Sequence, residues 1–255
     1  MSVRACKTLQ EASVFARRLH VHYQNPPPTP FRRELLLTLT TFQTGILDAA
    51  TFIGFGLFVA NMTGNVILLG AAITDLYPHF FYPHDVTPNI IALIAFFVGG
   101  FLTGLYERVS RQSEARHSRH FFASMTMVHC ALYFIAASLI FTDTIPVDPT
   151  SSLRLIIYAL LALGQGSQVV LSKRAGLPEF TTAVITSTIA DLSANANLSQ
   201  VRGKGMRGQL RRAASVIALF VGSIAGGETF KYQGFGVALF VAGGISYVTV
   251  FGWSL

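Results

Sequence analysis

One apolar stretch of the sequence carries residues that could bind a polar ligand. From Gly45 to Asn65 the chain reads GILDAATFIGFGLFVANMTGN, with a carboxylate at Asp48 and polar side chains at Asn61, Thr63 and Asn65. A charged residue inside a membrane span costs roughly 2.5–3.5 kcal/mol on insertion scales, so it normally faces a partner or a water-filled cavity. Asp48 is therefore a candidate for binding a proton, a cation or a polar group of a substrate.

Each of these residues also has a structural interpretation. The Asp48 carboxylate could cap the N-terminus of the following segment, or bond the backbone near the glycines that follow it. Thr63 and Gly64 could form a close contact between helices, and Asn65 could bond backbone groups freed by a helix break. The residue types alone leave both interpretations open.

Three further polar residues are candidates for the same site. Gln165 and Gln168 lie three residues apart, on one face of a predicted helix, and Thr186 lies in a short Thr-rich run. They either line the same cavity as Asp48 or join helices through polar contacts. His129 and Cys130 lack a second cluster of ligands, so we expect neither a metal site nor a cofactor.

Composition indicates where these residues lie. The chain of 255 residues is 51% hydrophobic and 12% charged, whereas soluble domains are about a quarter charged. This predicts an all-α, polytopic helical membrane protein whose main partner is the lipid bilayer. Lys and Arg exceed Asp and Glu by 19 to 12, but they flank apolar runs, as in cytoplasmic loops. Nucleic acid is therefore not an expected partner.

Loop charge sets the number of spans. The apolar runs are 35–53, 55–74, 89–106, 121–141, 153–171, 178–195, 213–228 and 233–252. The basic segments are 1–33, 106–120, 172–179 and 201–212. Placing every basic segment in the cytoplasm requires an even number of crossings between neighbours. The number of crossings is even between each pair of neighbouring basic segments if the runs 55–74 and 178–195 are interrupted or re-entrant. Six spans then remain, and both termini are cytoplasmic. The alternative is seven or eight full spans.

The domain organisation follows from the same pattern. Residues 1–33 are basic, carry NPPPTP and lack the apolar core of a signal peptide, so we expect a disordered cytoplasmic tail. Residues 34–252 are expected to form one helical membrane domain.

Two segments of this domain are similar. FFVGGFLTG begins at Phe96 and LFVGSIAGG begins at Leu219, 123 residues later, and the same offset places Thr186 opposite Thr63. We therefore expect an internal duplication, with halves 34–141 and 152–252. With three spans each, the halves would be inverted relative to one another, an arrangement in which broken helices line a transport site.

Glycines recur in these segments. They are expected to let helices pack closely, rather than to bind a nucleotide phosphate, which needs a preceding strand and an adjacent Lys. The packing candidates are Gly45, Gly99, Gly100, Gly104, Gly222, Gly226 and Gly227.

The opening stretch, followed by VILLG, resembles the signature of the YoaK family, multi-pass membrane proteins of bacteria and fungi with no known activity. The matching residues are Gly45, Asp48, Ala49, the run from Phe58 to Asn65, Gly70, and in the second half Gly166, Gln168, Arg174 and Thr186. The chain departs from the family at Val169, where the family tends to have a polar residue, and at Ser187, where it tends to have Gly. The resemblance implies a helical membrane fold and a site, but no substrate.

The sequence leaves three candidate functions. We expect secondary transport or permeation of a small solute or an ion through a polar central site, because twinned broken helices are typical of transporters. A membrane scaffold or sensor is the alternative, and an intramembrane enzyme using Asp48 with His129 is a weaker one. No catalytic constellation is predicted, and the sequence holds no ATP-binding motif.

Overall fold

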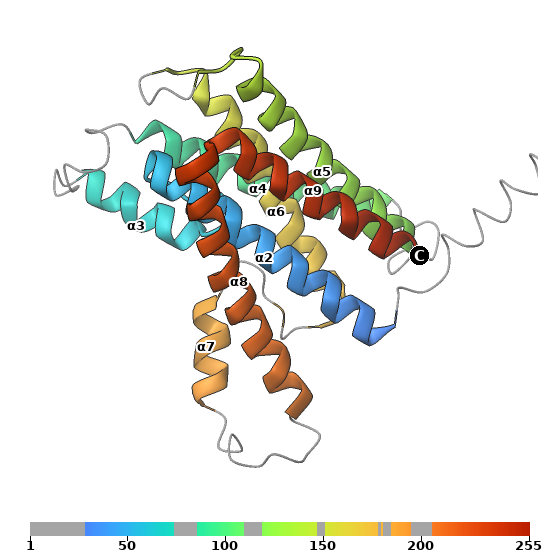
Figure 1. The fold of residues 1–255 in the computed structure, drawn as a ribbon. Coiled ribbons are helices and arrows are strands. Elements are labelled where there is room, and N and C mark those ends of the chain that lie inside the picture. The colour runs from blue at the N-terminus through green and yellow to red at the C-terminus, as the bar shows by residue number, and fades with distance from the viewer. Residues whose placement is uncertain are drawn as a thin grey trace, which may run out of the picture.

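The computed structural model describes residues 29–73, 86–109, 119–146, 151–177, 180, 185–194 and 206–255. Within these ranges the chain forms eight α-helices and no strand (Figure 1). The helices are α2 (Pro30–Phe55), α3 (Met62–Ile73), α4 (Thr87–Val109), α5 (Arg119–Phe141), α6 (Arg154–Arg174), α7 (Ile185–Ser193), α8 (Met206–Gln233) and α9 (Phe235–Ser254). The predicted all-α class is confirmed.

Six of these helices are long and apolar enough to cross a membrane. They are α2, α4, α5, α6, α8 and α9, and the protein is a polytopic helical membrane protein, as predicted. The first of them begins at Pro30, before the predicted domain boundary at residue 34, because a proline in the first helical turn needs no hydrogen-bond partner. The predicted tail lies outside the described residues up to residue 28.

The two remaining helices are too short to span. α3 has 12 residues and α7 has 9, which at the α-helical rise gives about 18 Å and about 14 Å. The hydrocarbon core of a bilayer is about 30 Å thick. The expectation that the runs 55–74 and 178–195 are interrupted agrees with these lengths, although much of 178–184 lies outside the described residues.

A glycine separates α2 from α3. Gly56 adopts a left-handed backbone with φ of 67°, and its N–H donates to the carbonyl of Phe52. Glycine takes this conformation without the steric cost that a Cβ adds. The chain then leaves the helical path over residues 57–61 and starts α3 at Met62.

The backbones of α2 and α8 touch. A Cβ added to Gly222 would lie 2.0 Å from the carbonyl oxygen of Phe42, and one added to Gly45 would lie 2.3 Å from that of Leu219. Gly226 makes a similar approach to Ile46, at 2.4 Å. Only glycine permits such contact, which maximises packing between helices in lipid.

The backbones of α4 and α6 touch in the same manner. An added Cβ would lie 2.0 Å from the carbonyl oxygen of Leu163 at Gly99, and 1.9 Å from that of Phe96 at Gly166. The predicted packing role does not extend to every glycine. Gly100 would make an ordinary contact at 3.5 Å, and an added Cβ at Gly104 would have nothing within 4 Å.

The other helices complete the bundle. α5 packs along α9, α9 also contacts α2 and α8, and α5 contacts α6. The short helices lie outside this arrangement, α3 against α4 and α7 against the N-terminal half of α8 (Figure 1).

Basic residues gather at one end of the bundle. Contacts between helix ends define that end: Arg33 donates to the carbonyl of Ala175 at 2.7 Å, and Arg119 donates to that of Leu255. The described basic residues at this end are Arg32, Arg33, Arg108, Arg119, Lys173, Arg174, Arg207, Arg211 and Arg212, and those at the other end are Arg154 and Lys231.

Ion pairs join the helix pairs at the basic end. Glu34 of α2 accepts from Arg211 at 2.6 Å and from Arg207 at 3.1 Å, both on α8. Glu107 of α4 pairs with Arg174 of α6 at 3.1 Å. Each close helix pair is therefore tied electrostatically at the same end.

We expect Glu34→Gln to lower the stability of the purified protein by about 1 kcal/mol, because Glu34 and Arg211 are only 17% and 15% exposed and partly buried charged hydrogen bonds are worth more than surface pairs. Thermal unfolding at low and high salt measures the loss. The control is Asp191→Asn, whose partner Arg212 lies 3.5 Å from a carboxylate that is 61% exposed. Equal stability of Glu34→Gln and wild type would contradict the prediction.

Candidate functional site

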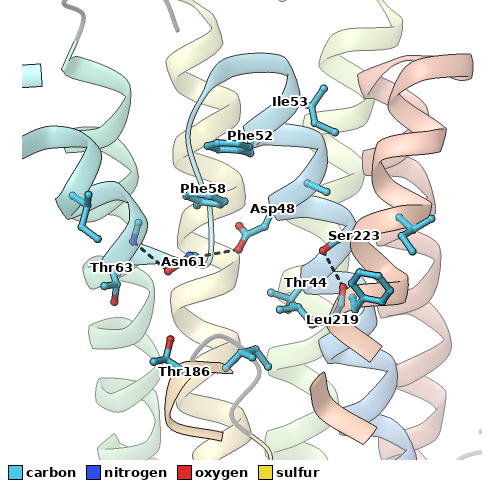
Figure 2. A pocket seen from close by; sticks show the side chains of 16 residues that line it. Thr44, Asp48, Phe52, Ile53, Phe58, Asn61, Thr63, Thr186, Leu219 and Ser223 are labelled. Carbon is cyan, nitrogen blue, oxygen red and sulfur yellow. Dashed lines mark hydrogen bonds between the residues drawn. The ribbon is translucent and has the colours of Figure 1, made fainter. Parts of the chain in front are cut away.

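After Gly56 the chain turns back along α2 into the bundle. Residues 59–61 lie beside Asp48, two turns before the end of α2 (Figure 2). The N-terminus of α3 therefore lies inside the protein rather than at the end of the bundle.

The Asp48 carboxylate holds this re-entrant segment in place. Oδ1 accepts the N–H groups of Val59 at 2.9 Å and Ala60 at 2.8 Å, and Oδ2 accepts that of Asn61 at 3.1 Å. Backbone groups freed by a helix break need such partners at membrane depth. An acid at the start of α3 also interacts favourably with the helix dipole. The observed hydrogen bonds of Asp48 are therefore those of a cap at the N-terminus of the following segment, which was its structural interpretation.

Asn65 and Asn61 complete the turn. Asn65 accepts the N–H of Phe58 at 2.8 Å and donates to its carbonyl at 2.6 Å, and the side chain is fully buried. Asn61 accepts the N–H of Gly64 at 3.2 Å. Asn65 thus bonds the freed backbone, which was the structural alternative for this residue, and it does not line the cavity described next.

Gly64 makes room for an aromatic ring. A Cβ at this position would lie 2.7 Å from the ring of Phe58, which stacks on Phe52 with ring centroids 4.6 Å apart. The Thr-Gly-Asn triplet therefore combines three roles: Thr63 faces the cavity, Gly64 admits the ring, and Asn65 bonds the turn.

A cavity of about 690 Å³ lies between α2, α3, α7 and α8 (Figure 2). Its polar lining residues are Thr44, Asp48, Asn61, Thr63, Thr186 and Ser223. Its other lining residues are Ala49, Phe52, Ile53, Phe58, Gly64, Ile67, Ile185, Leu219, Phe220 and Ile224. A volume of this size is within the range of small-molecule sites.

Five of the eight candidate binding residues meet at this cavity. They are Asp48, Asn61, Thr63, Gly64 and Thr186. Thr63 and Thr186 are each the second residue of a short helix, so the N-termini of α3 and α7 approach the same space (Figure 2).

Sequence reasoning missed two polar residues of the cavity. Thr44 lies one turn before Asp48 on the same face of α2, and that spacing could have identified it. Ser223 follows Gly222 in the segment similar to 96–104, but no pattern distinguished it from other serines. Its hydroxyl donates to the carbonyl of Leu219 at 2.9 Å and retains its capacity to accept.

The two glutamines do not line this cavity. Gln165 donates to the hydroxyl of Tyr133 at 3.1 Å, and Gln168 donates to that of Thr44 at 2.9 Å. Both are buried in the core of the bundle. The two glutamines therefore join helices through polar contacts, which was the alternative interpretation given by the sequence. Thr44 connects this core network to the cavity.

His129 belongs to the same polar core. Its Nε2 lies 2.9 Å from the hydroxyl of Ser167, which also accepts from Thr103 at 2.6 Å. His129 is absent from the cavity lining, so the geometry does not support the enzyme interpretation that paired it with Asp48. Among the described residues, no group of three or more His, Cys, Asp and Glu could hold a metal ion.

Comparison with known proteins places the whole membrane region in one family. Residues 36–251 match the family described as "Protein of unknown function (DUF1275)". The chain is 26% identical over 197 residues to the UPF0700 transmembrane protein YoaK of Bacillus subtilis (strain 168), covering 75% of this chain and 81% of that protein. No solved structure matches the chain.

Proposed function

The chain belongs to the family described as "Protein of unknown function (DUF1275)", and we propose that it moves a small solute or an ion across the membrane through the cavity at its two short helices. One observation carries this proposal: the N-termini of α3 and α7 approach a single cavity within a bundle of six long helices. In secondary transporters, the ends of half-helices meet at membrane depth and form the substrate site. With no ATP-binding motif in the sequence, transport would be secondary or facilitated.

The proposal includes an inverted repeat, which the helix contacts support. If α2, α3, α4 and α5 correspond to α6, α7, α8 and α9, the contact of α2 with α8 matches that of α6 with α4. The contacts of α2 with α9 and of α3 with α4 match those of α6 with α5 and of α7 with α8. α2 and α6 also run in opposite directions (Figure 1).

The close glycine contacts follow the same correspondence. Four backbone approaches form two matching pairs, which are Gly45 to Leu219 with Gly166 to Phe96, and Gly222 to Phe42 with Gly99 to Leu163. Matching positions lie 121 residues apart between α2 and α6, and 123 residues apart between α4 and α8. Such agreement in contact detail supports duplication more strongly than the short sequence similarity does.

The two halves differ at the carboxylate. The residue 121 positions after Asp48 is Val169, so an acid equivalent to Asp48 is missing from α6. We infer an asymmetric site in which the first half supplies the carboxylate and the second half supplies Thr186.

The basic end of the bundle supports an orientation. Lys and Arg concentrate in cytoplasmic loops of membrane proteins, and both the start of α2 and the end of α9 lie at the basic end. We therefore place both termini in the cytoplasm.

Flux into proteoliposomes tests the function. We expect the purified protein to transport at least one member of a panel of ions and small metabolites, and Thr63→Val and Thr186→Val to reduce that flux several-fold. Both threonines line the cavity, and neither hydroxyl forms a hydrogen bond with another residue of the described ranges, so these changes should leave stability intact. Thr142→Val, in an exposed turn after α5, is the matched control.

Two results would count against this reading. No flux from a folded protein across the panel would contradict transport and favour a scaffold or sensor. Unchanged flux in both threonine variants would instead remove the cavity from the path.

A further inference from the structure

The mouth of the cavity is apolar. Four of its lining residues are exposed large side chains: Ile53 at 57%, Ile67 at 66%, Phe220 at 65% and Ile224 at 51%. Ile53 lies on the spanning helix α2, and Phe220 and Ile224 lie on the spanning helix α8. Exposed apolar side chains along spanning helices face hydrocarbon. The cavity therefore opens sideways toward the bilayer.

The end of the cavity away from these apolar residues is polar. Asp48, Asn61, Thr63 and Thr186 lie there, around the starts of the two short helices (Figure 2). Oδ2 of Asp48 accepts one N–H among the described contacts and can accept another donor, and the Asn61 amide group also faces this space. A ligand seated here would have its hydrogen-bonding group at this polar end, beside Asp48, and its apolar body toward the apolar mouth.

The charge of the lining selects the head group. Among the described residues that line the cavity, Asp48 is the one with an ionisable side chain, and none is Lys, Arg or His. In surroundings of low dielectric, an anionic head would lie beside the Asp48 carboxylate, and the N-termini of α3 and α7 would offer it only partial positive charge. A cationic amine would instead meet an acceptor.

We propose that the cavity binds a lipophilic amine that enters from the bilayer through the mouth formed by Ile53, Ile67, Phe220 and Ile224. The amine head donates to Asp48 and its neighbours, and the apolar tail lies among Phe52, Phe58 and the mouth residues. This deepens the proposed transport function by naming a substrate class, but binding itself does not require that transport occurs.

Ligand-dependent thermal stabilisation in lipid nanodiscs tests the proposal. The probes are octylamine, octanol, octanoate and propylamine, compared at equal free concentrations in phosphatidylcholine discs. Unfolding is followed through Trp253, the single and buried tryptophan. We expect octylamine to raise the Tm in a saturable manner, octanol to raise it less, and octanoate and propylamine to leave it unchanged.

Matched variants separate the cavity from the membrane. Ile224→Phe narrows the mouth, whereas Ile217→Phe makes the same change one heptad earlier on α8, at a residue that is 61% exposed and lies outside the cavity lining. Thr186→Phe fills the polar end of the cavity from the exposed helix α7 and serves as a second variant. We expect the cavity variants to raise the apparent Kd for octylamine at least ten-fold and Ile217→Phe to leave it unchanged.

Specific results would overturn the proposal. Equal Tm shifts with octanoate and octylamine would exclude a preference for an amine head group. A Tm shift with propylamine equal to that with octylamine would exclude a preference for a lipophilic ligand. Saturable binding retained in both cavity variants would place the ligand elsewhere. Amine binding without flux of any solute would contradict the transport function alone, whereas flux of a tailless solute without amine binding would contradict this inference alone.

Discussion

Replacing Gly166 with alanine should separate α4 from α6 and lower the stability of the protein by about 1–3 kcal/mol, the usual cost of overpacking. The new Cβ would lie 1.9 Å from the carbonyl oxygen of Phe96, a backbone atom that cannot rotate away. The whole helix must shift instead, and the shift also disturbs Gly99 on the facing helix, whose own approach to Leu163 is 2.0 Å. Unfolding by heat or by SDS titration measures the loss.

Two glycines of the same bundle provide controls with the opposite expected sign. An added Cβ at Gly104 or at Gly244 would have nothing within 4 Å. Alanine in a helix interior is favoured over glycine by up to about 1 kcal/mol, so Gly104→Ala and Gly244→Ala should be neutral or stabilising. A stable Gly166→Ala, or an equal loss in all three variants, would contradict backbone contact as the basis of packing.

Asp48→Ala should release the segment between α2 and α3. The change leaves three backbone N–H groups without their acceptor, and each buried unsatisfied group costs about 1–3 kcal/mol. Some of these groups will bond water through the cavity, so we expect a total loss of about 3 kcal/mol. Thermal unfolding measures it. The chain has two cysteines, Cys6 and the buried Cys130, so thiol labelling of Asn61→Cys in a Cys6→Ser background should report faster access to the released segment.

The conservative variant separates charge from hydrogen bonding. Asp48→Asn retains one oxygen, which can still accept from Val59 and Ala60, but it presents an amide to the N–H of Asn61. We expect its loss of stability to be smaller than that of Asp48→Ala. Wild-type stability and labelling in Asp48→Ala would show that the carboxylate does not hold the turn.

The course of the chain could be predicted because it depends on local composition. A run of apolar residues long enough to span must form a helix, since no other structure satisfies its backbone within lipid. Loop charge also indicated which runs do not cross, whereas the end of the first helix at Gly56 came from the structure. Of the eight residues proposed from the sequence for one site, five line the cavity, and Asn65, Gln165 and Gln168 do not.

The partner of each polar side chain could not be predicted, because a partner lies wherever the helices bring it. Asn65 bonds the backbone of Phe58 across a turn whose path no propensity encodes. Gln168 bonds Thr44, 124 residues away, and so lies in the core instead of at the cavity. Gly104 shares its sequence context with Gly99, yet it faces open space, because helix rotation decides which glycine meets a neighbour.

The sequence by itself determined that this is a helical membrane protein, and its loop charge favoured six spans over seven or eight, because hydrophobicity and backbone hydrogen bonding act along the chain. Only the tertiary structure decided that Asp48 caps the re-entrant segment while also lining a cavity, and that this cavity lies among α2, α3, α7 and α8. Those features arise where segments distant in sequence pack together, and the spacing of residues along one helix does not specify what the next helix presents to them.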